Sequence, residues 1–168
     1  DVLNDLDVSA FLRFHRKKGA AASIALARVK DPTLYGLVET DAGGRILRFL
    51  EKPTWDEVTC NTINAGAYLF EPSVIERIPP GVPYSLERGL FPSLREAKLP
   101  FYGFVTSGYW MDIGYVEKYL QVHLDILDPP AADGCPLGHV LRKAALGKPL
   151  LQGVIATECS HFRNHVHV

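Results

Sequence analysis

The stretch YGLVETDAGGRILRFLEKP (residues 35–53) decides the fold, because it contains two strand patterns and the turn that joins them. Residues 35–39 and 45–51 carry aliphatic and aromatic side chains typical of strands. Between them, residues 41–44 read Asp-Ala-Gly-Gly, and glycine adopts the positive φ of a tight turn at little cost. We therefore predict an antiparallel hairpin. Pro53 ends its second strand and is expected to bias Lys52 toward an extended backbone.

Further strands and helices alternate on both sides of this hairpin, which predicts an α/β domain with a mixed sheet. Apolar residues mark further strands at residues 22–29, 63–70 and 101–106. Helices are predicted over residues 7–19, 72–78 and 116–127 from capping residues, glycines, prolines and apolar spacing. A further helix is predicted to begin at Ser85 and to break or kink at Pro92.

Composition excludes several classes of function. The 168 residues carry a formal net charge of −1, so there is no positive field to collect nucleic acid or anionic lipid. No apolar run approaches the roughly 20 residues that cross a bilayer. Three scattered cysteines fit a reducing cytoplasm better than a disulfide framework. Because the chain opens at Asp1 and its one methionine is Met111, we expect part of a longer polypeptide, with a trimmed, self-sufficient domain as the alternative.

Residues 129–168 differ from residues 1–128, and we treat them as a separate linker and tail. Gly147 and Gly153 lie six residues apart, the spacing of a left-handed β-helix, although a poorly specified tail is the alternative that we favour. Histidines near the C-terminus, together with Cys159, have strand spacing that would suit zinc, but solvated side chains explain them better. His15 and His123 are expected at the polar edges of their helices.

Three sites carry groups suited to binding phosphates and sugars. Asp112 precedes Ile113-Gly114 between a strand and a helix, where a carboxylate ligates Mg²⁺, caps the helix or is a solvated loop charge. Glu51 is able to accept hydrogen bonds from sugar hydroxyls, and the Lys52 ammonium suits phosphate. Asn64 places an amide among apolar neighbours, for which a structural hydrogen bond and a ligand contact are equally good explanations.

Five motifs in order resemble those of the sugar-1-phosphate nucleotidyltransferases, also called sugar-nucleotide pyrophosphorylases. They are residues 1–3 (Asp-Val-Leu), 35–39 (Tyr-Gly-Leu-Val-Glu), 49–53 (Phe-Leu-Glu-Lys-Pro), 63–68 (Ile-Asn-Ala-Gly-Ala-Tyr) and 109–114 (Tyr-Trp-Met-Asp-Ile-Gly). The resemblance covers about residues 1–128 and is nearest to the mannose-1-phosphate guanylyltransferases. It implies the C-terminal part of a Rossmann-like, glycosyltransferase-A-like domain that contains the sugar-phosphate half.

The resemblance also implies a role for each matching residue. Asp1 and Asp112 match the two carboxylates that bind Mg²⁺, and Lys52 matches the contact to the sugar phosphate, so these three are the expected catalytic residues. The expected substrate-binding residues are those that match contacts to the sugar ring or its phosphate, namely Gly36, Glu51, Lys52 and Asn64.

The implied reaction joins a sugar 1-phosphate to a nucleoside triphosphate and releases pyrophosphate. Mannose 1-phosphate and GTP, giving GDP-mannose, are the expected substrates. The alternatives are a glucose-1-phosphate uridylyl-, thymidylyl- or adenylyltransferase, and a non-catalytic homologue that only binds sugar nucleotide. The family's glycine-rich nucleotide loop has no match in residues 1–168, so we expect no turnover by this chain alone. The sequence leaves open whether the protein forms a homo-oligomer.

Overall fold

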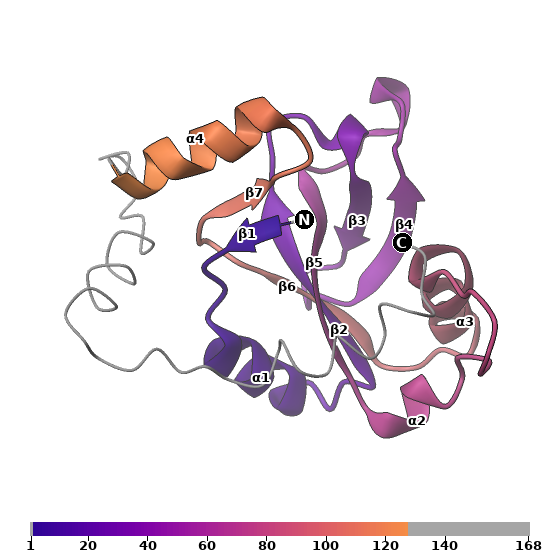
Figure 1. Cartoon of the computed structure of the whole chain (residues 1–168). Helices are drawn as coiled ribbons and strands as arrows, with labels where there is room; N and C mark the ends of the chain where they lie inside the picture. The colour runs from indigo at the N-terminus through magenta and orange to yellow at the C-terminus, as the bar shows by residue number, and fades with distance from the viewer. Residues whose placement is uncertain (1, 128–168) are drawn as a thin grey trace. The chain divides into compact units, whose positions relative to one another are not determined.

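The computed structural model describes residues 2–127, which fall into two compact units. The first unit contains residues 2–7 and 107–127, and the second contains residues 8–106. Asp1, the tail at 129–168 with its expected β-helix spacing, and the C-terminal Cys and His residues lie outside the described residues. Figure 1 labels the helices and strands of both units.

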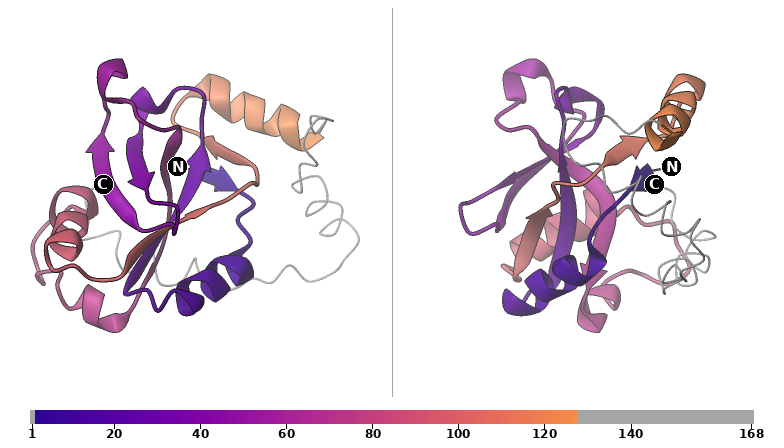
Figure 2. Two further views of the ribbon diagram at one scale, coloured as in Figure 1. Left: turned by 180° about the vertical axis from the view of Figure 1, so that it is seen from behind. Right: turned by 90° about the vertical axis from the view of Figure 1, so that its left-hand side faces the viewer.

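The second unit is built on a five-stranded sheet with the order β4-β3-β5-β2-β6 (Figures 1 and 2). Its strands are β2 (Ala22–Arg28), β3 (Gly36–Thr40), β4 (Ile46–Glu51), β5 (Thr62–Phe70) and β6 (Phe101–Val105). Strands β3 and β4 form the predicted antiparallel hairpin, and β2 pairs antiparallel with β5 but parallel with β6. The prediction of a mixed α/β domain is therefore confirmed.

Helices α1 (Val8–Lys17) and α3 (Phe91–Glu96) cover opposite faces of this sheet. The ring of Phe11 in α1 stacks on Phe104 at 5.4 Å, and Phe91 in α3 packs against Phe101 at 5.4 Å between ring centroids. Because side chains alternate along β6, Phe101 and Phe104 point to opposite faces. Strand β2 lies between β5 and β6 and is buried on both faces, which explains its run of small and aliphatic residues.

Two other helical segments differ from their predictions. The helix expected over residues 72–78 is a short α2 (Pro72–Ile75). The segment after Ser85 begins as a π-helix, η3 (Leu86–Leu90), in which the Leu90 amide donates to the Ser85 carbonyl at 3.3 Å. Pro92 then falls in the first turn of α3, where its missing N–H is tolerated. Two 3₁₀ turns, η1 (Pro32–Leu34) and η2 (Trp55–Glu57), join the remaining strands.

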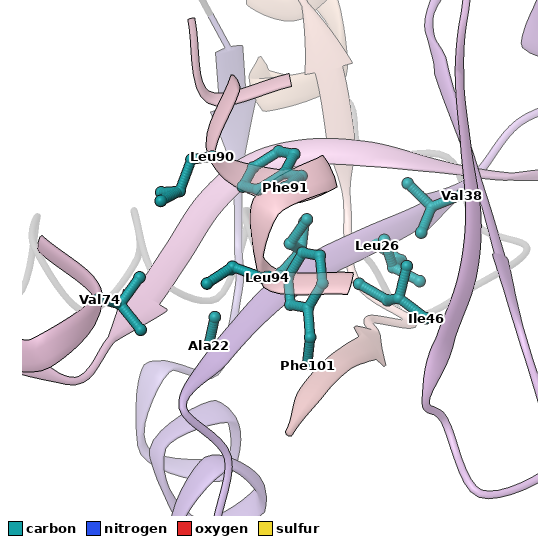
Figure 3. Close-up of a cluster of buried hydrophobic side chains, with 10 residues drawn as sticks. Ala22, Leu26, Val38, Ile46, Val74, Leu90, Phe91, Leu94 and Phe101 are labelled. Atoms are coloured by element: carbon teal, nitrogen blue, oxygen red, sulfur yellow. The ribbon is translucent and has the colours of Figure 1, made fainter. Parts of the chain in front are cut away.

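The core of the second unit lies between β2 and α3 (Figure 3). Phe91 is fully buried at its centre, and the rings of Phe49, Tyr68 and Phe101 surround it at 5.4–5.7 Å between centroids. The other buried members of this cluster are Ala22, Ile24, Leu26, Val38, Ile46, Val74, Leu90 and Leu94. Packing of this apolar face supplies the stability that short helices such as α3 lack by themselves.

His15 is buried, which corrects the prediction that it lies at a polar edge. It follows Phe11 by four residues, so the two side chains share the face of α1 that meets the sheet. The imidazole tolerates burial because both ring nitrogens have partners: Nδ1 lies 2.8 Å from the Ser23 hydroxyl and Nε2 lies 3.2 Å from the Glu71 carboxylate. His123, by contrast, is exposed on α4 (Val116–Leu127), as expected.

The first unit contains a two-stranded antiparallel ladder of β1 (Val2–Asn4) and β7 (Trp110–Asp112), followed by α4 over its predicted bounds. Val2 pairs with Asp112, and the Asp5 amide extends the ladder by donating to the Tyr109 carbonyl at 3.1 Å. The Asp5 carboxylate rests against Gly108 so closely that a Cβ there would overlap it. Among the described helices, none is long and apolar enough to span a membrane.

We predict that Leu94→Ala destabilises the second unit by about 2–5 kcal/mol, because Leu94 is fully buried and its truncation leaves a cavity beside Phe91. The matched control is Leu34→Ala, whose leucine is 60% exposed; it should change the free energy of unfolding by less than about 0.5 kcal/mol. Urea unfolding followed by circular dichroism measures both. Equal effects for the two variants would contradict the packing described above.

Candidate functional site

Three strands bring Glu51, Gly36 and Asn64 into one row at one end of the sheet. Gly36 of β3 lies opposite Glu51 of β4. On its other side β3 pairs with β5 through Leu37 and Ile63, and this register places Gly36 next to Asn64. Residues in one row share a face of the sheet. The structure therefore brings together three of the four residues expected to bind substrate.

The side chains of Phe49 and Glu51 closely approach the backbone at Gly36. A Cβ at this position would lie 2.8 Å from Cζ of Phe49 and 3.1 Å from the Glu51 carboxylate oxygen Oε2. The first distance is shorter than side chains tolerate, so any larger residue has to displace the Phe49 ring or the Glu51 side chain. Glycine here lets the Phe49 ring and the Glu51 carboxylate lie against the β3 backbone.

A bulge in β5 shapes the Asn64 side of the row. Between the pairs Ile24–Tyr68 and Leu26–Asn64, the β5 strand has three intervening residues whereas β2 has one. Gly66 within the bulge has a φ of +79°, which glycine adopts without strain. The bulge shortens the path along β5, so that the Asn64 amide reaches the Tyr68 hydroxyl, four residues further on, at 2.8 Å.

The orientation of the Asn64 amide is set by the backbone. The Gly66 N–H donates to Oδ1 at 3.0 Å, so Nδ2 must face the other way. From there Nδ2 donates to the Tyr68 hydroxyl oxygen and, at 3.4 Å, to Oε1 of Glu87. Of the two explanations that the sequence allows for Asn64, the structure therefore shows the structural hydrogen bonds. Through these bonds Asn64 holds the side chains of Tyr68 and Glu87 in place.

Glu87 enters the site from the π-helix η3, and it shares the site with Glu51. Burial raises the pKa of the Glu87 carboxyl above its ordinary value, and the negative charge of Glu51 raises it further. Burial likewise raises the pKa of the Tyr68 hydroxyl to about 12, with the Glu87 and Glu51 charges adding to the shift against the lowering effect of Asn64. The arrangement is a set of hydrogen-bond acceptors beside one protonated phenol, which suits a ligand rich in hydroxyl groups.

Lys52 follows directly after Glu51, and its backbone corrects the expectation of an extended conformation. Its φ is +47°, in the left-handed region, while its amide donates to the Tyr35 carbonyl at 3.0 Å and so extends the β3–β4 ladder by one bond. The left-handed turn ends the alternation of side chains at Glu51. Lys52 is exposed and forms no ion pair within residues 2–127, so its ammonium is available to an anion.

Asp112 belongs to the first unit, at the end of β7 opposite Val2. Its carboxylate has no hydrogen-bond partner among the described residues. Gly114 leaves the space beside it open, since a Cβ there would only touch the carboxylate oxygens at 3.6 Å. No group of three or more acidic, His or Cys side chains within residues 2–127 is placed to hold a metal ion. One or two carboxylates are nevertheless what Mg²⁺ commonly takes from a protein, with phosphate oxygens completing its shell, so Asp112 fits the expected ion.

Tyr68 and Glu87 are site residues that the sequence did not single out. For Tyr68 a signal existed, because a glycine within a strand pattern indicates a bulge, and a bulge is what brings Tyr68 to Asn64. For Glu87 the sequence shows an acid in the first turn of a helix, which is usually a solvated residue that favours the helix dipole. Only the fold reveals that this turn faces β5.

We predict that Glu51→Gln lowers the pKa of Glu87 toward, but not to, its ordinary value, because the variant removes the charge and leaves the burial. A raised pKa in the folded protein means that Glu87 reduces stability above that pKa, and that this cost disappears as the pH falls. Glu51→Gln should therefore stabilise the protein fully above the raised Glu87 pKa and not at all below the ordinary value for a glutamate, with the gain growing between the two. Carbon NMR titration of the Glu87 carboxyl measures the shift, and an unchanged pKa would show that the two carboxylates do not interact.

Comparisons with known proteins identify the family of this chain. A family model described as nucleotidyl transferase matches residues 1–129. A UTP–glucose-1-phosphate uridylyltransferase from Synechocystis sp. is 43% identical over 129 residues, covering 76% of this chain and 33% of the relative. A mannose-1-phosphate guanylyltransferase from Mycobacterium tuberculosis is 41% identical over 140 residues, covering 83% and 38%. The chain thus spans about a third of the length of these curated relatives.

Solved structures show the same fold. HddC from Yersinia pseudotuberculosis superposes with a TM-score of 0.60 at 26% identity, over 72% of this chain and 50% of that one. HddC complexed with GMP-PN gives a TM-score of 0.59 over the same shares. The predicted resemblance and the Rossmann-like fold class are confirmed. With a family model matched over residues 1–129 and relatives of that family above 40% identity, the chain belongs to the sugar-1-phosphate nucleotidyltransferases.

Proposed function

We propose that the protein transfers a nucleotidyl group from a nucleoside triphosphate to a sugar 1-phosphate, and that residues 2–127 provide the sugar-phosphate side of that reaction. The observation that carries this proposal is the row of Glu51, Gly36 and Asn64, with the Lys52 ammonium directly after it. Hydrogen-bond acceptors for hydroxyl groups beside an exposed ammonium are the features needed to bind a sugar that carries a phosphate.

In this proposal, the residues of the row bind and orient the sugar. Glu51 and the free oxygen of Glu87 accept hydrogen bonds from its hydroxyls, while Tyr68, protonated at neutral pH, is able to donate one. Because Asn64 already holds Glu87 and Tyr68 in place, little conformational freedom is lost when the sugar binds.

Lys52 neutralises the phosphate, and its left-handed backbone turns the side chain out of the strand pattern beside Glu51. Reaction requires two anions to approach each other, so removing negative charge and fixing the direction of attack are the main tasks. The attacking phosphate oxygen is already ionised near neutral pH, and no general base is needed. The sugar phosphate attacks the α-phosphorus, and pyrophosphate departs with the electrons of the broken P–O bond.

Asp112 and Asp1 are proposed to hold Mg²⁺. The pairing of Val2 with Asp112 supports this, since Val2 follows Asp1 directly in the chain. The ion, when bound, would supply a Lewis acid and a template for the phosphate oxygens. Asp112 itself is positioned by the β1–β7 ladder, which fixes the direction of its carboxylate.

Mannose 1-phosphate and GTP are the substrates that we propose. The relatives named mannose-1-phosphate guanylyltransferase, from Mycobacterium tuberculosis and Arabidopsis thaliana among others, support this choice. Glucose 1-phosphate and UTP are the second candidate, supported by the uridylyltransferase from Synechocystis sp.. Measuring pyrophosphate release by the full encoded polypeptide, with each pair of substrates, distinguishes the two. Binding of sugar nucleotide without release from any pair would instead indicate a non-catalytic homologue.

We predict that Lys52→Met weakens the binding of mannose 1-phosphate to this chain by about 10- to 100-fold, because a charge-assisted bond to phosphate is lost. Binding of mannose, which lacks the phosphate, should be unchanged. Lys17→Met, which removes an exposed charge from α1, is the control and should affect neither ligand. Saturation-transfer NMR measures both affinities. An equal loss for mannose and mannose 1-phosphate would refute the assignment of Lys52 to the phosphate.

For Asp112→Asn in the full encoded polypeptide, we predict a fall in kcat of at least about 100-fold with little change in the KM for the sugar phosphate, since a metal carboxylate acts mainly on the transition state. The Mg²⁺ concentration needed for half-maximal activity should rise. Glu117→Gln, on the neighbouring helix α4, is the control for loss of an acidic charge. Turnover that is unchanged in Asp112→Asn would remove Asp112 from the proposed metal site.

A further inference from the structure

Outside the row of Glu51, Gly36 and Asn64, the second unit has a small hollow lined by three basic residues. It measures about 230 Å³ and lies where the start of β4, the end of α3 and the start of β6 meet. The basic residues are Arg45, Arg95 and Lys98, and the apolar part of the wall includes Ile46, Leu99 and Phe101. No acidic residue lines it.

The positive charges of this hollow are uncompensated. None of the three basic side chains forms an ion pair with another described residue. The chain as a whole carries a formal net charge of −1, so three cations around one hollow are a local exception. Like charges repel at this separation, and a bound anion would relieve the repulsion.

Arg45 is held in place before any ligand arrives. Its Nη2 donates to the Lys98 carbonyl at 3.1 Å, and its backbone amide donates to the Asp41 carboxylate at 2.9 Å. The guanidinium has five N–H groups in a rigid fork, so these bonds leave donors directed elsewhere. An arginine fixed by a backbone carbonyl and still rich in free donors is suited to bind an oxyanion.

Lys98 occupies a backbone position that favours glycine. The Leu99 amide donates to the Leu94 carbonyl at 3.0 Å and the Lys98 amide donates to the Arg95 carbonyl at 2.9 Å, which together form a Schellman motif at the end of α3. Lys98 is the residue of this motif with positive φ, at +54°, where glycine is the usual choice. A strained lysine at the mouth of a basic hollow suggests that its charge is used there.

We propose that this hollow binds the phosphate group of a small phosphorylated metabolite, at a second site apart from Glu51 and Lys52. Arg45 and Glu51 stand at opposite ends of the same strand, about 20 Å apart at roughly 3.3 Å per residue. A volume of about 230 Å³ accommodates a phosphate and a few further atoms, with Ile46 and Phe101 against the apolar part of the ligand. Lys98 and Arg95 close the hollow from the end of α3.

Inorganic phosphate, titrated into the full 168-residue chain at constant ionic strength with chloride as the balancing ion, tests this proposal. The amides of Leu99 and Phe101 should shift in a saturable way in heteronuclear NMR spectra. Acetate and chloride should not reproduce the shift. A response that does not saturate, or an equal response to chloride or acetate, overturns the proposal.

Variants separate this site from the sugar-phosphate site. Arg95→Gln and Lys98→Gly should each weaken phosphate binding at the hollow by about tenfold. Lys52→Met should leave it unchanged, and so should the control Arg77→Gln, which removes an exposed positive charge outside the hollow. Lys98→Gly should at the same time keep or raise the melting temperature, because glycine relieves the strained backbone. Undiminished phosphate binding in both Arg95→Gln and Lys98→Gly, or loss of the Leu99 and Phe101 response in Lys52→Met, overturns the proposal. The function proposed for Glu51 and Lys52 is tested separately, by the binding of mannose 1-phosphate.

Discussion

The cross-strand register that places Gly36 between Glu51 and Asn64 is the constraint on which the candidate site depends. A shift of one residue in either ladder would turn Glu51 or Asn64 to the other face of the sheet. The register is secured from both sides: the hairpin turn fixes β3 against β4, and the buried aliphatic residues of β2 and β3 fix the sheet against α3. The packing of the core and the geometry of the site are therefore set by the same pairing.

The closeness of the Glu51 and Glu87 carboxylates opposes the ionisation of Glu87. Burial raises the pKa of the Glu87 carboxyl and the charge of Glu51 raises it further, so ionising Glu87 in the folded chain costs free energy. Asn64 offsets part of this cost by donating to Glu87 and to Tyr68. In many enzymes the functional site lowers the stability of the fold, and the packing of the hydrophobic core compensates for the loss.

Much of the fold could be predicted from the sequence, because the patterns that indicate its strands, turns and helices lie within short stretches of the chain. The hairpin rests on the glycines at 43 and 44, and α4 rests on helical apolar spacing. What the sequence could not supply came from tertiary contacts. The burial of His15 needs Ser23 and Glu71 as partners, the left-handed Lys52 overrides the preference that Pro53 imposes, and Glu87 reaches Asn64 only because η3 packs beside β5. The local structure of a residue could be predicted from its neighbours in the sequence, whereas its tertiary contacts could not.

The π-helix η3 makes this part of the chain intolerant of changes in length. A π-turn contains one residue more than an α-turn, and here the bond from the Leu90 amide to the Ser85 carbonyl closes it. Deleting one residue from η3 would convert the π-turn to an α-turn. The residues before the deletion would then rotate by about 100° about the helix axis relative to α3. Glu87 would then leave Asn64, although the hydrophobic residues of α3 stayed in the core. Insertions and deletions among related proteins should accordingly accumulate at surface turns such as residues 41–44 and spare residues 86–90.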